Sequence, residues 1–461
     1  MLREVIFRRP LMDNMFFYTA KSRKRRRNRR HITLMLVISA LLVGFGGYFF
    51  SRLFLDTYDY EEEVVETDPA YETASWSSSD HNSNTNGIYM LWSETDISSL
   101  LPSGNPGDEV WMSDFVDTRT KVNAKGIYIP SGYFNRKIDE ALDLVDNTEL
   151  NAMVIDIKND KGFITYMMDY DLARQIDACT DTIADIKATV KKLKEHGVYL
   201  IARVVSLKDP VLAGKMPELA LRNKDGSLFR DSSGLPWVNP YDERVWDYLI
   251  EICRQCVEVG FDEVNLDYIR FSTDSGMENV DFGPRATETT RMEIITDGIK
   301  KLCETIKPMG AFVSCDVYGS VISSATDASI VGQNYFNMAK YLDYICPMVY
   351  PSHYGNGYYG LDYPDCHPYE LVYHALMDSK KVLYMLDADE NVAQVRPWLQ
   401  DFTATWVKNH IEYGAGEVRS EINAVYDAGY SQWFLWNTAA SYTSGALLDP
   451  DDTSDTSDQK E

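Results

Sequence analysis

The chain has 461 residues, and its content of 45% hydrophobic and 12% aromatic residues is enough for a large core. Its formal net charge of −25 disfavours nucleic acid and other anionic polymers as ligands. The seven cysteines are too sparse for a disulfide scaffold, and Cys253 and Cys256 lie in an apolar helical stretch that predicts structural burial. Both a nucleic-acid-binding protein and a disulfide-stapled domain are therefore disfavoured.

The chain begins with a basic segment, residues 1–31, which has eleven Lys or Arg residues and two acidic ones. Residues 32–50 contain no charge over nineteen positions, long enough for a helix to cross a hydrocarbon layer of about 30 Å. This stretch exceeds a signal-peptide core, and no small-x-small cleavage motif follows it, so we expect an uncleaved transmembrane helix. Because basic residues stay on the cytoplasmic side, the pattern predicts a single-pass cell-membrane protein whose remaining chain is extracellular.

Residues 51–121 are acidic and rich in Ser, Asn and Thr, and residues 446–461 are acidic as well. Neither segment has the apolar periodicity of a packed domain, so we expect a stalk after the membrane span and a disordered tail. The basic segment carries +9, which leaves −34 for the rest of the chain. That charge suits a solvated surface facing neutral or cationic ligands.

Short β-rich runs alternate with amphipathic helices between residues 122 and 445. Eight runs are predicted strands: residues 126–131, 152–158, 198–205, 263–271, 311–319, 344–351, 394–402 and 431–437. Residues 181–197 and 292–306 are two of the helices between them. This rhythm predicts the α/β class and a closed (β/α)8 TIM barrel. A doubly wound sheet is disfavoured because residues 130–135, PSGYFN, make a poor phosphate loop.

Charged, polar and aromatic residues gather at the predicted strand ends, where a parallel barrel places its active site. They are Asp156, Arg203, Asp267, Arg270, Asp316, Tyr350, His353, Trp398, Gln400, Asp401, Trp436 and Asn437. Asp267 and Asp316 end adjacent strands, so we expect these carboxylates to face one cleft as the catalytic pair. Asp156 and Asp401 are the alternative carboxylates. The competing structural interpretation is an ion pair between Asp267 and Arg270 that only stabilises a strand end.

Hydrolysis of a glycosidic bond needs one carboxyl group to protonate the leaving oxygen and a second to act as nucleophile or to activate water. The blocks KGIYIPSG, VIDIKND, NLDYIRF, CDVYG, PMVYPSHY, VRPWLQDF and FLWN follow one another along the chain. In these blocks the chain resembles the glycoside hydrolase family called domain of unknown function 4015, over about residues 122–445. The resemblance implies a TIM barrel of the glycosidase type. Ser272 stands where that family carries a proline, which affects a turn and leaves the carboxylates in place.

We therefore expect a membrane-anchored, extracellular glycoside hydrolase that cleaves a cell-wall or secreted polysaccharide. The strand-end residues other than Asp267 and Asp316 are predicted to bind the substrate. We expect no cofactor, no metal and no nucleic-acid partner, and the membrane contact is assigned to residues 32–50.

Two other classes of protein remain open. A glycan-binding barrel without catalysis would use Tyr133, Tyr350, Trp398 and Trp436 as stacking surfaces for sugars. A metal-dependent polysaccharide deacetylase would need a cluster of histidines and carboxylates, and it would have to use His353, His367 and His374, the histidines grouped near one another after the sixth strand.

Overall fold

The computed structural model describes residues 112, 115–386 and 392–449. The predicted basic segment, the membrane span 32–50, most of the stalk and residues 450–461 of the tail lie outside these ranges. Among the helices inside these ranges, none is both long enough and apolar enough to cross a membrane.

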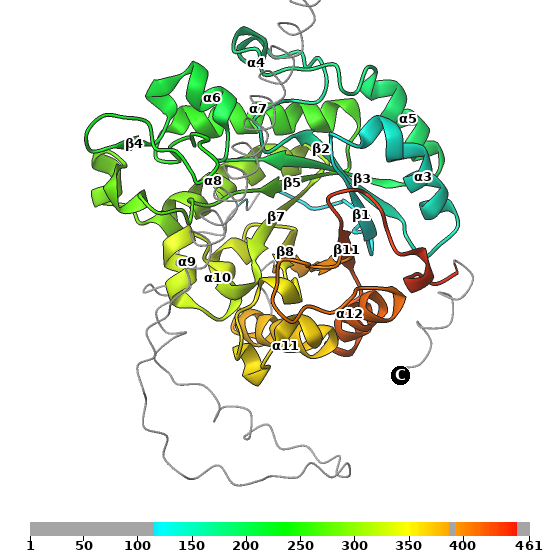
Figure 1. Ribbon diagram of the computed structural model, residues 1–461. Coiled ribbons are helices and arrows are strands. Elements are labelled where there is room, and N and C mark those ends of the chain that lie inside the picture. Colours follow the sequence, from blue (N-terminus) through cyan, green and yellow to red (C-terminus); the bar gives the residue numbers. More distant parts are fainter. Residues whose placement is uncertain (1–111, 113–114, 387–391, 450–461) are drawn as a thin grey trace, which may run out of the picture. The chain divides into compact units, whose positions relative to one another are not determined.

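The core of the domain is a parallel β-barrel surrounded by helices, as predicted (Figure 1). The barrel strands are β1 (Lys125–Ile129), β2 (Ala152–Lys158), β3 (Tyr199–Val205), β5 (Glu263–Asp267), β7 (Phe312–Tyr318), β8 (Tyr344–Met348), β9 (Gln394–Val395), β10 (Trp398–Gln400) and β11 (Trp433–Trp436). They are hydrogen-bonded in the order β10-β11-β1-β2-β3-β5-β7-β8-β9. A further parallel pairing, between Trp398 and Met348, joins β10 to β8 and closes the barrel.

The seventh predicted strand is divided into β9 and β10 by Arg396 and Pro397. Proline has no amide hydrogen to donate to a neighbouring strand, which explains the interruption. The other seven predicted strands are each found, with ends that differ by a few residues.

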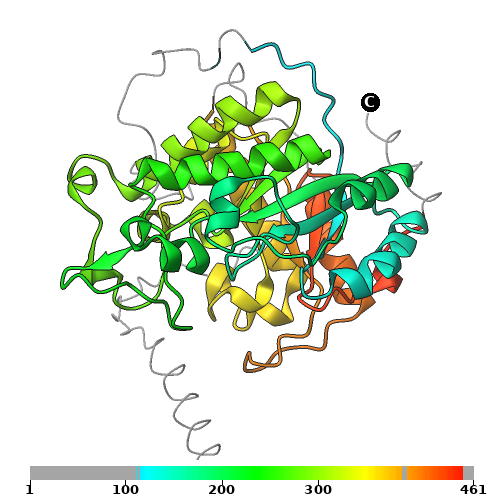
Figure 2. The same cartoon turned by 90° about the horizontal axis from the view of Figure 1, so that it is seen from above.

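Helices connect successive strands and cover the outside of the barrel (Figures 1 and 2). They are α3 (Phe134–Asp146), α4 (Asp171–Gln175), α5 (Ile186–Glu195), α6 (Pro210–Lys215), α7 (Glu243–Val259), α8 (Arg291–Ile306), α9 (Ala325–Val331), α10 (Tyr335–Ala339), α11 (Pro368–Tyr384) and α12 (Ala415–Asp427). The predicted helix 181–197 begins only at Ile186, because the Asp185 side chain caps it by accepting the backbone N–H of Ala188. The predicted helix 292–306 corresponds to α8, which starts with a capping box of Thr290 and Glu293.

Successive side chains of a strand point to opposite faces, so each barrel strand contributes to two separate cores. Its outward side chains pack against the helices in the larger cluster of buried residues. Its inward side chains form a second cluster inside the barrel, which includes Tyr128, Val154, Ile201, Cys346 and Phe434. Gly126 belongs to this inward set, and a Cβ there would lie 2.9 Å from the Phe434 ring, so the packed interior requires a glycine. The barrel is filled and is not a channel.

Two segments extend the domain beyond the predicted barrel. The short strands β4 (Arg222–Asn223) and β6 (Val280–Asp281) pair in an antiparallel manner and stand out from the ring of helices (Figures 1 and 2). Residues of the predicted stalk also pack on the barrel, since Arg119 forms an ion pair of 2.7 Å with buried Asp343. The packed domain therefore starts a few residues before position 122.

Candidate active site

The polar residues predicted at the strand ends form the last inward-facing layer of the barrel. On each strand the polar residue comes two positions after another inward-facing residue. Asp156 follows Val154 on β2, Arg203 follows Ile201 on β3, and Asp267 follows Asn265 on β5. The layer comprises Tyr128, Asp156, Arg203, Asp267, Asp316, Gln400 and Trp436. The period of two along each strand therefore brings these side chains to the carboxyl ends of the strands.

Arg203 occupies the centre of this layer and binds two carboxylates. Its Nη1 donates to Asp156 Oδ1 at 2.6 Å, and its Nε donates to Asp267 Oδ2 at 3.0 Å. The Arg203 side chain is only 4% exposed. A buried guanidinium is costly unless it is paired, and here two neighbouring strands supply the negative charge.

Asp316 lies on the next strand in a different environment. Its Oδ1 accepts hydrogen bonds from Trp398 Nε1 at 2.7 Å and from Asn265 Nδ2 at 2.9 Å. Burial, and then the negative charge of Asp267, raise the pKa of Asp316 well above its usual value, although the two donors oppose this shift. Asp316 therefore holds its proton to a higher pH than an ordinary aspartate.

Asp267 ends β5, and Asp316 lies two residues before the end of the neighbouring β7; the register of the two strands pairs Leu266 with Cys315, one position before each aspartate. Asp267 does not pair with Arg270, because its ion pair is with Arg203 on β3. The interpretation of an Asp267–Arg270 ion pair is thus wrong. The reason is that the inward phase of the strand points Asp267 at its neighbour across the sheet and not at the following loop.

Arg270 lies in the loop after β5, among three aromatic rings. Its guanidinium carbon is 4.5 Å from the ring centroid of Tyr318, 5.1 Å from that of Tyr268 and 5.4 Å from that of Trp237. Its Nη1 donates to the carbonyl of Phe271 at 2.8 Å. These rings help to stabilise a cation at the rim of the barrel.

The aromatic residues predicted at the strand ends fall into two groups. Trp436 is half-buried and stacks on Tyr128, with centroids 4.2 Å apart and an interplanar angle of 6°. Trp398 is completely buried and offers no ring face to a ligand. Trp398 therefore does not stack on a substrate as predicted. Its indole N–H donates to Asp316 and positions that side chain.

Three more of the predicted binding residues form hydrogen bonds within the protein. Gln400 is completely buried, and its Oε1 accepts from Ser352 Oγ at 2.7 Å. Asp401 accepts from Thr443 Oγ1 at 2.6 Å, and Asn437 Nδ2 donates to the Asp401 carbonyl at 2.6 Å. Burial raises the pKa of Asp401. These contacts fasten neighbouring loops, so the three residues support the rim, and their contact with a substrate stays a prediction.

Tyr350 and His353 follow β8 and lie at the same end of the barrel. Tyr350 is buried, and burial together with the charges of Asp316 and Asp267 raises the pKa of its hydroxyl well above the usual value. The His353 ring lies 5.2 Å from the Tyr350 ring, and burial among its neighbours lowers the pKa of His353. His353 is therefore neutral in neutral solution.

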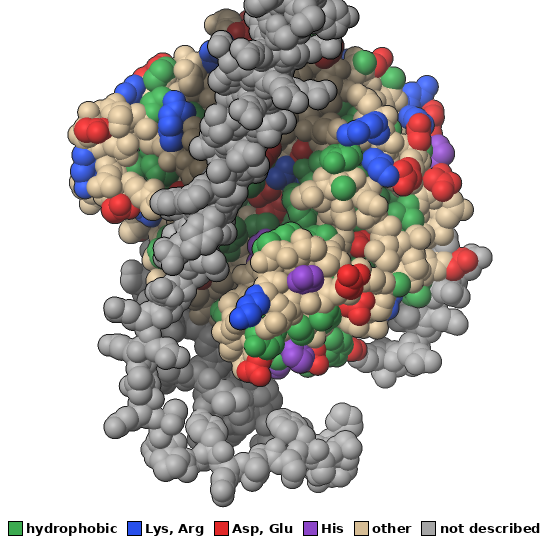
Figure 3. Space-filling model, in the orientation of Figure 1, with side chains coloured by type: hydrophobic (Ala, Val, Ile, Leu, Met, Phe, Trp, Pro, Cys, Tyr) green, Lys and Arg blue, Asp and Glu red, His purple; other side chains and the backbone are tan. Residues whose placement is uncertain are grey.

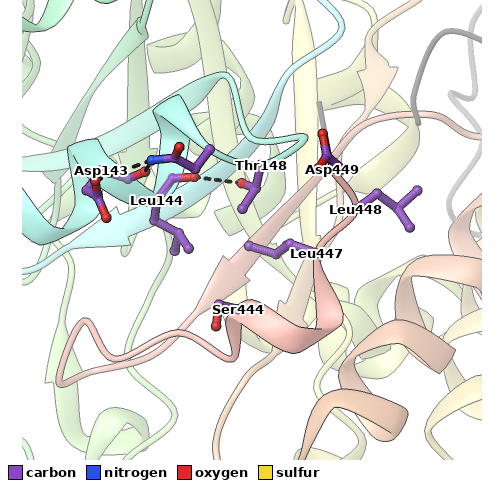
Figure 4. Close-up of a pocket in the computed structure, with 8 residues that line it drawn as sticks. Asp143, Leu144, Thr148, Ser444, Leu447, Leu448 and Asp449 are labelled. Atoms are coloured by element: carbon purple, nitrogen blue, oxygen red, sulfur yellow. Dashed lines mark hydrogen bonds between the residues drawn. The ribbon is translucent and has the colours of Figure 1, made fainter. Parts of the chain in front are cut away.

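A surface hollow of about 430 Å³ lies away from this layer. It is lined by Asp143, Leu144, Asn147, Thr148, Ser444 and Leu447–Asp449 (Figure 4). It sits beside the end of α3, next to the start of β2, and so belongs to the amino-terminal face of the barrel, opposite the face where a TIM barrel carries its active site. Around the centre of the face seen in Figure 1, acidic and basic side chains show among apolar ones (Figure 3).

The alternative of a metal-dependent deacetylase finds no support in the side chains. Within the described ranges, no three His, Cys, Asp or Glu residues are grouped so that they could hold a metal ion, and this includes His353, His367 and His374. Cys253 and Cys256 are both fully buried in α7, as their sequence context predicts.

The sequence interpretation missed several residues of the site. Tyr128 donates its hydroxyl to Asp156 Oδ2 at 2.9 Å, and Asn265 holds Asp316. Asn265 precedes Asp267 by two positions, so the period of the strand could have revealed it. Tyr268 has a φ of 49° and donates its backbone N–H to Asp267 Oδ1 at 2.6 Å. A positive φ is unfavourable for a bulky residue, and no sequence signal predicts it.

A closed (β/α)8 barrel that gathers carboxylates at the carboxyl ends of its strands is an architecture on which glycoside hydrolases are built. Residues 126–442 match the family model described as "Putative glycosyl hydrolase domain", domain of unknown function 4015. The chain belongs to this family and is a glycosidase, which confirms the resemblance drawn from its sequence blocks.

The chain is also similar to several solved structures. A hypothetical protein from Ruminiclostridium thermocellum is 33% identical, with 41% of this chain and 97% of that chain covered and a TM-score of 0.39. The glycoside hydrolase domain of PgaB (BpsB) from Bordetella bronchiseptica is 14% identical, with 69% and 94% covered and a TM-score of 0.49. The α-galactosidase TtGalA from Thermus thermophilus is 11% identical, with 73% and 61% covered and a TM-score of 0.42. No curated protein matches the chain.

Proposed function

We propose that Asp267 and Asp316 are the catalytic pair and that Asp316 is the general acid. The observation that carries this assignment is the contrast between their environments. Asp267 is ion-paired with Arg203, whereas burial and the neighbouring negative charge raise the pKa of Asp316. Two carboxyl groups whose surroundings favour opposite protonation states are what acid-assisted glycoside cleavage requires.

In the proposed reaction Asp316 donates its proton to the departing glycosidic oxygen. Asp267 then supplies negative charge on the other side of the sugar, either as nucleophile or as the base that activates water. Arg203 holds the Asp267 carboxylate in position, while Trp398 and Asn265 fix the orientation of Asp316. Tyr128 and Trp436 supply a stacked pair of rings next to this centre.

Asp267→Asn tests the proposal, because it removes the charge and retains an oxygen that can accept from Arg203. We expect turnover to fall by at least about 10³-fold, a loss of roughly 4 kcal/mol in transition-state stabilisation, while glycan binding and folding persist. Arg203 keeps Asp156 as a partner in this variant. Asp225→Asn on the exposed turn near β4 is the matched control and should leave activity unchanged. A destabilised but fully active Asp267→Asn protein would transfer the role to Asp316 with Asp401.

We further propose that the enzyme is anchored in the cell membrane by residues 32–50 and cleaves a cell-wall or secreted polysaccharide outside the cell. The basic segment before this uncharged stretch and the acidic chain after it support this orientation. Protease added to intact cells should digest the domain and spare the arginine-rich end. Protection of the whole chain, or a mature N-terminus after Phe50, would contradict the anchor.

A further inference from the structure

A tryptophan stands exposed on the loop that connects β10 to α12. Trp406 is 66% exposed, and its ring stacks on that of Phe402, with centroids 5.8 Å apart and an interplanar angle of 20°. This loop leaves the carboxyl end of a barrel strand, as the loops that carry the candidate catalytic residues do. Single exposed aromatic residues are common on protein surfaces, so exposure alone says little.

Trp406 differs from an isolated surface residue because its ring continues an aromatic row that leads to the candidate catalytic centre. Phe402 lies 6.1 Å from Tyr350, and Tyr350 lies 6.4 Å from Trp436. The Trp436 ring in turn lies 5.5 Å from the Arg203 guanidinium. The row therefore runs from the ion pair of Asp267 outward to solvent.

The outer part of the row is held in place by hydrogen bonds between two loops. The His353 ring meets Trp406 edge-on, with centroids 6.5 Å apart and an interplanar angle of 85°. His353 Nδ1 is 3.0 Å from Ser352 Oγ, which donates to Gln400. Gln400 Nε2 donates to the carbonyl of Phe402 at 3.1 Å. One buried side chain therefore joins both loops, so the rings are preorganised.

We propose that Trp406, supported by Phe402 and His353, is a stacking subsite for a sugar ring that is distant from the scissile bond. The ring occupying it belongs to the same glycan chain that extends between Asp267 and Asp316. The substrate is accordingly an oligosaccharide or polysaccharide and not a small glycoside. This inference rests on the proposed function for the identity of the reaction, but the binding site can be tested without turnover.

The continuity of the aromatic row and the charge of the chain both favour a neutral or cationic sugar as the occupant. An apolar ring with an exposed face binds the C–H face of a sugar, and the net charge of −34 beyond the basic segment favours neutral or cationic sugars over acidic ones. A second exposed aromatic residue, Tyr384, is 84% exposed but lies at the end of α11, far along the chain from any strand end. It provides a matched control with no part in the row.

The experiment measures binding of cello-, chito- and partially deacetylated chito-oligosaccharides to the full-length chain by calorimetry, with two and with six sugar units. For the series that binds, we expect Trp406→Ala to weaken the affinity for the hexasaccharide by about tenfold and to leave that for the disaccharide unchanged. Trp406→Phe should retain most of the affinity, and Tyr384→Ala should behave as the wild type. The proposal is overturned if Trp406→Ala binds the hexasaccharide normally, if both lengths lose affinity equally, or if no probe binds the wild-type chain.

Hydrolysis of the same probes separates this inference from the proposed function. Cleavage that is abolished by Asp267→Asn and is insensitive to Trp406→Ala at limiting hexasaccharide would leave the function intact and remove the subsite. Length-dependent binding that Trp406→Ala weakens, without any cleavage, would establish the subsite and contradict the proposed reaction.

Discussion

Asp316 accepts both of its hydrogen bonds on one carboxylate oxygen, from Trp398 and Asn265. An asparagine at this position can present its own oxygen to the same two donors. Asp316→Asn therefore removes the charge of the side chain and keeps its shape. Because the pKa of Asp316 is raised in the folded protein, its favourable contribution to stability is present at low pH and is lost as the pH rises through the folded value.

We expect Asp316→Asn to become more stable relative to the wild type as the pH rises from about 4 to 7, and to lose at least about 10²-fold in turnover. The check is a pair of thermal melts of both proteins at the two pH values, with turnover measured on the same preparations. A difference in melting temperature that is the same at both pH values would show that Asp316 does not hold its proton in the folded state.

Trp398 offers a second way to test the protonation of Asp316. Its indole N–H stabilises the charged carboxylate, so Trp398→Phe should raise the pKa of Asp316 further and move the alkaline limb of the kcat/KM profile to higher pH. The matched control is Trp433→Phe, which removes an equally buried indole that donates to Tyr426 instead. An unshifted limb in Trp398→Phe, or an equal shift in both variants, would assign that limb to another group.

At the scale of elements, the packing of α7 against α8 depends on one glycine. Gly298 lies in the middle of α8, and a Cβ there would overlap the indole ring of Trp246 on α7. Replacing glycine by alanine in a helix usually stabilises it by up to about 1 kcal/mol. Here the overlap reverses the sign, because a packed interface accommodates an added methyl group poorly.

We therefore expect Gly298→Ala to lower the free energy of unfolding by about 1–3 kcal/mol. Gly416→Ala in α12, where an added Cβ would have no neighbour within 4 Å, should raise it by as much as about 1 kcal/mol. Urea unfolding of both variants gives the comparison. Equal changes in the two proteins would mean that α8 can shift away from Trp246 without cost.

The elements themselves were largely visible in the sequence. Runs of apolar residues identified every barrel strand, and the period of two explains why Asp156, Arg203 and Asp267 share a face. The partner of Asp267 was not visible, since Arg203 precedes it by 64 residues and meets it only through the register of β3 against β5. Arg270, which is close to Asp267 in the sequence, is not its ion-pair partner.

The same limit applied to burial and to loops. Trp398 begins β10 and Trp436 ends the neighbouring β11, two positions apart in register, yet only Trp436 is partly exposed. Trp406 lies in a loop with no periodic pattern, so its place beside Phe402 and His353 depends on the folded contacts of Gln400. Depth within a barrel and the path of a loop are three-dimensional properties that one sequence does not encode in any local pattern.

At the scale of the whole molecule, one buried ion pair crosses the interior of the barrel. Arg396, between β9 and β10, donates to both carboxylate oxygens of Glu263 at 3.0 Å, and neither side chain is exposed. Glu263 begins β5, and in the sheet order β7 and β8 separate that strand from β9. The pair therefore links opposite walls, beneath the layer that holds the candidate site.

Breaking such a pair from one side strands a buried charge, whereas neutralising both partners removes the cost. Arg396→Met should thus lower the free energy of unfolding by about 3–5 kcal/mol, even though Ser314 and Tyr199 still donate to Glu263. The double variant Arg396→Met with Glu263→Gln should recover much of that loss in urea unfolding.

The exposed pair of Lys301 with Asp247 provides the control for this prediction, because its side chains are 46% and 63% exposed. Lys301→Met should cost at most about 1 kcal/mol. Two results would show that the charges do not join the two walls. Arg396→Met could lower the free energy of unfolding no more than Lys301→Met does, or the double variant could be no more stable than Arg396→Met alone. The tight packing of Arg396 on the Tyr344 ring, 3.7 Å from its centroid, would then account for the conformation instead.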